Sequence, residues 1–186
     1  MNVQLPVHMD KAAFLAWAEG REERYELVEG RVVMMVNASW AHALMVSNLI
    51  GLLRLAVDLK QWAVVAEFGV DGGPRTLRFP DVMVTRRGVA PAARTAPQPA
   101  VLIEVLSPST AKFDLGDKLA EFLHLPDLSA YLVFAQDEKK AWAWVRGEAG
   151  FTPAPAVFER DQATISLPAL GVTMSLAHVY SDVALD

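Results

Sequence analysis

The sequence has no cysteine among its 186 residues, which excludes thiol nucleophiles and thiolate metal sites and leaves carboxylate and imidazole groups to carry chemistry. It has no apolar run long enough to cross a bilayer, and no basic segment followed by an apolar stretch at its start. The serine-elbow, Walker and dinucleotide glycine patterns are also missing, so acyl transfer through serine and nucleotide binding by those loops lack support. These absences favour a soluble, cytoplasmic protein with no membrane partner.

A surplus of positive charge is absent too. The net charge of −5 argues against a protein that coats nucleic acid indiscriminately. From Gly72 to Ile103 the balance is reversed, because Asp81 is the only acid there and it is accompanied by Arg75, Arg78, Arg86, Arg87 and Arg94. A solvated arginine-rich loop explains this pattern as well as a nucleic-acid contact does. The prediction is that Arg75, Arg78, Arg86 and Arg87 bind DNA.

Apolar residues make up 53% of the chain, enough for a core without disulfides, and one domain over residues 1–186 is expected. Hydrophobic periodicity, helix caps and turn residues predict the elements. They are a helix at 11–18 capped by Asp10, a hairpin of strands at 25–28 and 31–35, a helix at 39–59 capped by Ser39, strands at 62–70, 77–85 and 100–106, a loop at 87–99, a helix at 114–123, strands at 130–135, 142–145 and 163–167, and a helical turn at 176–180. The central order of helix, three strands, helix and strand, at about 25–135, predicts an α/β (α+β) fold with a mixed sheet flanked by helices and an N-terminal hairpin.

Glu104 is the most informative residue, because its carboxylate interrupts the apolar run Val101–Leu106. An unpaired charge in a buried strand costs several kcal/mol, so Glu104 needs a cation. Asp81 opens the strand before it, and neighbouring strands lie about 4.8 Å apart, so the two carboxylates could bind one Mg²⁺ or Mn²⁺ ion. Such an ion polarises a phosphoryl oxygen and lowers the pKa of bound water. With Lys118 to orient the attacking water, this set fits phosphodiester hydrolysis.

Two of these residues have simpler explanations when each is taken alone. Asp81 follows Pro80 and can merely hydrogen-bond the turn. Lys118 can form an exposed pair with Asp114, four residues earlier on the predicted helix. Only the combination of two acids and a lysine favours a functional site.

Three further groups could join this site at the edge of the sheet. Glu26 lies in the predicted hairpin, and His42 lies in the first turn of the long helix, where a surface or capping role is the simpler explanation. Glu67 is another strand carboxylate and a candidate outer ligand of the metal.

The order of Arg24–Gly30, His42, Pro80–Val82, Ile103–Thr110 and Lys118 resembles the Uma2 family of restriction endonucleases, a branch of the PD-(D/E)xK nuclease superfamily. Its most specific segment is Glu-Val-Leu-Ser-Pro-Ser-Thr, which begins at residue 104. The resemblance implies a restriction-endonuclease-like fold and a Mg²⁺-dependent DNA endonuclease. It implies metal binding by Asp81, Glu104 and the carbonyl of Val105, with Glu26 and His42 as accessory catalytic residues. The superfamily's usual lysine position is Leu106 here, and the resemblance points to Lys118 instead.

One position and one segment depart from the family pattern: Phe122 stands where relatives tend to carry tyrosine, and Phe134–Asp137 replaces a Val-Asp-Pro-like strand end. Neither removes a metal ligand.

A homodimer is expected, because two sites related by a two-fold axis cut both strands of a duplex most simply. Two alternatives stay open: a nucleic-acid-binding module of the same fold with little or no cleavage, and a metal-dependent hydrolase of a smaller phosphoester, which would need a closed pocket rather than an open basic groove.

Overall fold

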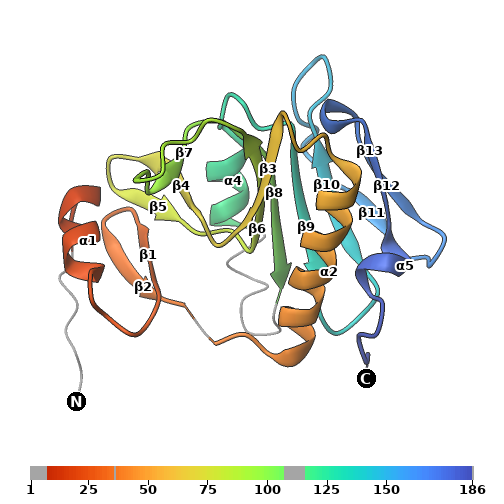
Figure 1. Cartoon of the computed structure of the whole chain (residues 1–186), viewed down its shortest axis with the longest axis horizontal. Coiled ribbons are helices and arrows are strands. Elements are labelled where there is room, and N and C mark those ends of the chain that lie inside the picture. The colour runs from red at the N-terminus through yellow and green to blue at the C-terminus, as the bar shows by residue number, and fades with distance from the viewer. Residues whose placement is uncertain (1–7, 36, 107–115, 186) are drawn as a thin grey trace.

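The computed structural model, drawn in Figure 1, describes residues 8–35, 37–106 and 116–185. Six strands form its central sheet in the order β11-β10-β9-β8-β6-β3. Their bounds are β3 (Trp62–Ala66), β6 (Val82–Arg86), β8 (Pro99–Leu106), β9 (Ala130–Ala135), β10 (Ala141–Val145) and β11 (Ala156–Phe158). β8 and β9 are parallel and the other neighbours antiparallel. Every residue of β8 and β9 is buried, which explains why both strands are almost continuously apolar.

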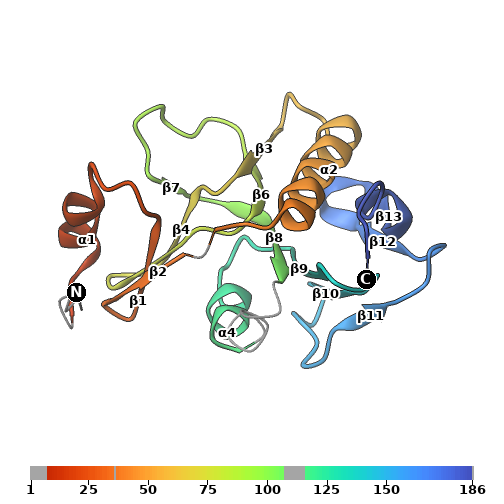
Figure 2. The same ribbon diagram turned by 90° about the horizontal axis from the view of Figure 1, so that it is seen from below.

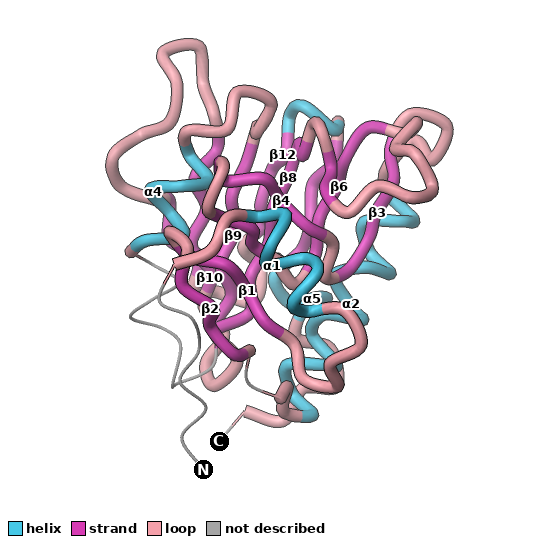
Figure 3. The backbone as a smooth tube through the Cα atoms, turned by 90° about the vertical axis from the view of Figure 1, so that its left-hand side faces the viewer, coloured by secondary structure: helices cyan, strands magenta, loops and turns pink. Residues whose placement is uncertain are grey.

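A five-stranded sheet lies beside the central one, at the left of Figure 1. Figure 3 shows the molecule with this left-hand side facing the viewer. Its order is β2-β1-β5-β4-β7, with β1 (Tyr25–Val28), β2 (Arg31–Met34), β4 (Gly69–Gly73), β5 (Thr76–Arg78) and β7 (Thr95–Ala96). It has a small core of its own, built on Phe14, Leu27, Val32 and Leu77. The antiparallel pair β12 (Thr164–Leu167) and β13 (Val172–Ser175) is joined by a 3₁₀ turn, η1 (Pro168–Leu170).

Helices cover both faces of the central sheet, as Figure 2 shows for α2 (Trp40–Ala56) and α4 (Asp117–Leu123). Alternate residues of each strand face opposite helices. Val101 and Ile103 pack in one cluster with Met45, Leu49 and Leu53 of α2, whereas Leu102 and Leu106 pack in another with Phe122 of α4. α5 (Leu176–Val179) lies on the α2 side. None of the described helices combines the length and apolarity needed to cross a membrane.

The predicted caps form as expected. Asp10 Oδ1 accepts a hydrogen bond from Ala13 N at 2.8 Å at the start of α1 (Lys11–Ala18), and Ser39 Oγ accepts one from His42 N at 3.1 Å at the start of α2. The order α2, β3, β6, β8, α4, β9 confirms the predicted core and the mixed sheet with its N-terminal hairpin. The single-domain assignment stays a prediction.

Two predicted strands are each broken in two. The strand expected at 62–70 divides into β3 and β4, and that expected at 77–85 divides into β5 and β6. One half of each pairs in the central sheet and the other half in the five-stranded sheet, so the hairpin they form bends from one sheet into the other. At the bend Glu67 has a left-handed φ of 52°, and its N–H donates to the carbonyls of Pro80 and Asp81 at 3.1 and 3.3 Å. Asp81 therefore lies where the chain enters the central sheet.

The remaining differences are small. The predicted loop at 87–99 contains β7, and β11 and β13 were not predicted, because strands of two to four residues show little alternation. The predicted helix start at Asp114 and the segment Ser107–Thr110 lie outside the described residues.

Candidate active site

Asp81 and Glu104 come together through the pairing of β6 with β8. Val82 pairs with Ile103, and extending this antiparallel register by one residue sets Asp81 opposite Glu104. Directly opposite residues share a face of the sheet, with Cβ atoms about 4.5–5.5 Å apart. Two residues further along each strand, Met83 and Leu102 belong to the core on the α4 side. Glu104 therefore lies on the side of the sheet that α4 covers, and Asp81 lies at the edge, just before β6 begins.

Lys118, in the first turn of α4, supplies the cation that the buried Glu104 requires. Lys118 Nζ lies 3.0 Å from Glu104 Oε1. The side chains are only 12% and 5% exposed, so this lysine is not part of an exposed surface pair. Asp114, the alternative partner, lies outside the described residues.

Glu26 reaches the same ammonium from the other sheet. It lies in β1 and is buried, with Oε1 3.5 Å from Lys118 Nζ. The same oxygen accepts a hydrogen bond from Phe79 N at 3.0 Å. Lys118 thus lies between two carboxylates, one from each sheet.

The carboxylate of Asp81 is held at the end of the β6 ladder. Its Oδ2 accepts a hydrogen bond from Val105 N at 2.7 Å and lies 3.2 Å from His42 Nε2. Among the described residues, no hydrogen bond reaches Oδ1. A turn-forming role for Asp81 alone does not account for these contacts, since the partners come from β8 and α2.

His42 projects from the first turn of α2 toward Asp81, with its side chain 16% exposed. Burial lowers the pKa of His42, but the hydrogen bond to Asp81 and the charges of Asp81 and Glu67 outweigh it, so the pKa is raised above 6.5, its ordinary value. Its Nδ1 atom is buried and has no hydrogen-bond partner in the described part of the chain. Glu67 lies further out, half exposed and paired with Arg24.

The structure corrects the prediction for Arg78. It is buried, with 5% of its surface exposed, so it cannot contact a DNA phosphate in this conformation. Its Nε and Nη2 atoms each donate to one oxygen of Glu121 at 2.7 Å, and Nη1 donates to Glu26 Oε2 at 3.2 Å. The charge count along the sequence missed these partners, which lie 52 and 43 residues away.

The other predicted DNA contacts are exposed but do not surround the acids. Arg86 and Arg87 lie at or beyond the end of β6, roughly 17 Å along the strand from Asp81 at about 3.4 Å per residue. Arg86 also packs over the ring of Trp62, 3.9 Å from its centroid. Arg75 lies in the turn between β4 and β5 of the other sheet. The basic segment therefore divides between the two sheets rather than forming one groove around Asp81.

Sequence reasoning also missed Glu121, on the same face of α4 as Lys118, three residues further on.

Formal charges show why these groups occur together. Four carboxylates, those of Glu26, Asp81, Glu104 and Glu121, meet two cations, Lys118 and Arg78. Among these six described side chains, the acids outnumber the cations by two. No group of three or more His, Cys, Asp or Glu side chains among the described residues is already arranged to hold a metal ion.

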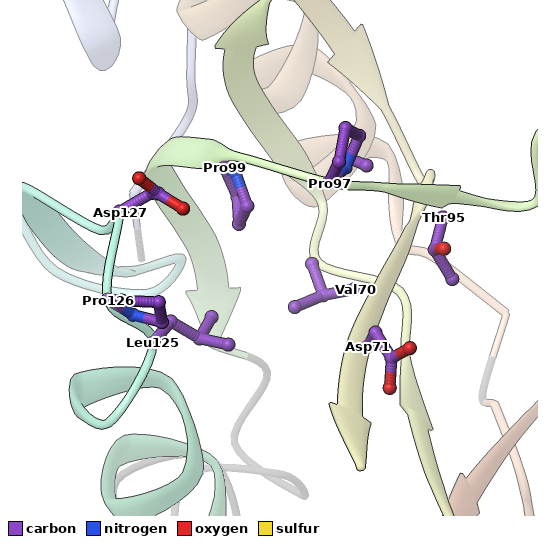
Figure 4. A pocket seen from close by; sticks show the side chains of 9 residues that line it. Val70, Asp71, Thr95, Pro97, Pro99, Leu125, Pro126 and Asp127 are labelled. Atoms are coloured by element: carbon purple, nitrogen blue, oxygen red, sulfur yellow. The ribbon is translucent and has the colours of Figure 1, made fainter. Parts of the chain in front are cut away.

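The cavity in Figure 4, of about 290 Å³, lies elsewhere. It is lined by residues of β4, β7 and the start of β8 and by the loop after α4, among them Val70, Pro97, Pro99 and Pro126. Of its two acids, Asp71 already pairs with Lys11. None of the residues assembled around Glu104 lines it, so it is not the closed pocket expected of a hydrolase acting there on a small phosphoester.

Comparison with known proteins assigns the fold. A crystal structure of a "putative nuclease belonging to DUF820" from Anabaena variabilis is similar with a TM-score of 0.75 at 16% sequence identity, over 95% of this chain and 98% of that chain. The protein has the restriction-endonuclease-like fold. The model of the Uma2 family, described as "Putative restriction endonuclease", matches residues 12–177, and the chain belongs to this family.

Two Synechocystis proteins are similar in sequence. The uncharacterized protein sll1609 is 27% identical over 138 residues, which cover 67% of this chain and 73% of the relative. The uncharacterized protein slr1290 is 29% identical over 130 residues, which cover 64% of this chain and 65% of the relative.

Proposed function

We propose that the protein is a DNA endonuclease that depends on a divalent metal ion, Mg²⁺ or Mn²⁺, bound by Asp81 and Glu104. The observation that carries this proposal is that Asp81 and Glu104 each adjoin the paired residues Val82 and Ile103, with Lys118 Nζ 3.0 Å from Glu104. Membership of a family of restriction endonucleases supports the reaction class.

The donor set fits a hard divalent cation, because it consists of oxygen atoms only. Val105 N–H points to Asp81, and in an extended strand the carbonyl of a residue points to the same side as its N–H. This supports the carbonyl of Val105 as a third ligand. When bound, the ion would polarise the scissile phosphate and lower the pKa of a water molecule.

Three side chains would prepare the site for this reaction. Lys118 is placed to orient the attacking water and to stabilise the negative charge that develops on the phosphate. Glu26 also contacts the ammonium of Lys118, at 3.5 Å. His42 contacts the carboxylate of Asp81 and helps to hold it where it accepts the hydrogen bond from Val105 N, near the end of β8.

The proposal includes DNA as the substrate, a homodimer and a cytoplasmic location. Exposed arginines at 75, 86, 87 and 94 are candidates for phosphate contacts at a distance from the acids. A DNA-binding module without cleavage remains the second candidate, supported by the pairing of Lys118 with two acids, which holds the ammonium back from a substrate unless a metal competes for Glu104.

Cleavage of supercoiled plasmid with Mg²⁺ or Mn²⁺, compared with EDTA, tests the proposal. Glu104→Gln keeps the volume of the side chain and should abolish cutting, while Glu159→Gln, which changes an exposed acid paired with Lys140, should leave it intact. Cutting that persists in Glu104→Gln would point to a contaminating nuclease. An intact plasmid with every metal would favour the binding module, and DNA retention in a gel-shift assay would then support it.

A further inference from the structure

Arg78 is a buried arginine three residues before Asp81. Three of its nitrogen atoms donate hydrogen bonds to two acids: Nε and Nη2 to both oxygens of Glu121, each at 2.7 Å, and Nη1 to Glu26 at 3.2 Å. The guanidinium thereby joins β1 of the five-stranded sheet to α4 through a planar fork, which an ammonium group lacks.

Both acids that Arg78 holds are linked to Lys118. Glu121 follows Lys118 by three residues on α4, a spacing that sets both side chains on one face of the helix. Glu26 turns its second oxygen toward Lys118 Nζ, at 3.5 Å. Arg78 therefore fixes the helix that carries Lys118 and the acid that faces its ammonium group.

We propose that Arg78 is a positioning residue, whose guanidinium fork sets the place of Lys118 against Glu104. The assay of cleavage rests on the proposed nuclease function, whereas the position of Lys118 can be measured without it. A residue that only ties the helix to the sheet needs positive charge and bulk, and lysine provides both. A positioning residue needs the bidentate geometry, which lysine cannot reproduce. Arg78→Lys therefore separates the two roles.

The first measurement is the NMR signal of the Lys118 ammonium group, assigned by its loss in Lys118→Met. We expect the signal to shift toward those of exposed lysines in Arg78→Lys, and also in Glu121→Gln, which keeps the bond between Arg78 and Glu26. Arg146→Lys is the matched control, because Arg146 donates to Leu128 O at 2.6 Å and Leu125 O at 2.8 Å just after α4 but touches none of these acids. An unshifted Lys118 signal in either folded site variant would overturn the proposal, and Glu121→Gln decides if Arg78→Lys does not fold.

The second measurement is single-turnover cleavage. Loss of a residue that orients a catalytic group costs about 10–100-fold in activity, so Arg78→Lys should cut that much more slowly with an unchanged Kd for DNA. Weaker DNA binding with an unchanged rate would contradict a positioning role. If the wild-type protein does not cut DNA at all, the proposed function fails, and the NMR measurement still decides the role of Arg78.

Discussion

Replacing Lys118 by methionine should destabilise the folded protein by about 3–5 kcal/mol, the usual penalty for removing one partner of a buried ion pair. The magnitude follows from the geometry. Lys118 Nζ lies 3.0 Å from Glu104 and 3.5 Å from Glu26, and the three side chains are 12%, 5% and 7% exposed, so water cannot replace the lost ammonium. Glu26 keeps its hydrogen bond from Arg78 in this variant.

A second substitution distinguishes lost charge compensation from lost packing. Glu104 lies on the same face of β8 as Leu102 and Leu106, so leucine suits its surroundings. The double variant Glu104→Leu/Lys118→Met should recover most of the loss, because apolar replacement of a whole buried pair is often neutral or stabilising. The interaction energy between the two sites should be about 0.5–3 kcal/mol. The double variant should have no nuclease activity despite its recovered stability.

Urea unfolding in EDTA, followed by the fluorescence of the five tryptophans, measures these free energies. Lys139→Met is the control, because Lys139 is 38% exposed and pairs with the exposed Asp161 at 3.0 Å, so its loss should cost less than about 1 kcal/mol. A loss below about 1 kcal/mol in Lys118→Met, or a double variant no more stable than Lys118→Met, would refute the reasoning.

Three further predictions follow from the bend and from Asp81. Glu67→Gly should be about 1 kcal/mol more stable than Glu67→Ala in urea, because both lose the pair with Arg24 but only alanine keeps the left-handed strain at φ 52°; equal stabilities would argue against that strain. The pKa of His42 is raised, so its protonated form stabilises the fold below pH 6.5 and this contribution is lost as pH rises through the folded pKa. His42→Asn should therefore cost more stability at about pH 5.5 than at about pH 8.5, and a reversed order would exclude this linkage. Magnesium at about 100 times its Kd should stabilise the wild-type protein by about 2.7 kcal/mol, seen as a higher Tm, and Asp81→Asn should abolish the effect. A Tm that does not respond to Mg²⁺ or Mn²⁺ would count against the metal site.

Local patterns in the sequence were sufficient for the main elements and for one feature of the site. The apolar neighbours of Glu104 required a buried strand and a cation, and both are present. The caps Asp10 and Ser39 were likewise readable, because capping depends on residues within one turn.

Features that depend on distant residues could not be read in this way. The sequence of Arg78 and its neighbours contains no sign of Glu26 or Glu121, so the arginine counted as surface charge. The two long strands looked continuous because their hydrophobic residues run through the bend. Their division depends on which sheet each half joins, and that is decided by pairing with strands remote in the chain.

The distribution of buried charge favours a functional role for this site over a structural one. Buried ion pairs contribute little net stability, since desolvation offsets their attraction. Yet ionised side chains from β1, β5, β8 and α4 meet at one junction, whereas pairs such as Lys139 with Asp161 and Lys140 with Glu159 are more exposed. Stability alone does not require this concentration, because leucine would suit the position of Glu104 between Leu102 and Leu106. The charges are better explained by chemistry that needs an acid pair with a lysine beside it, and the recovered stability of an inactive Glu104→Leu/Lys118→Met variant would express that difference directly.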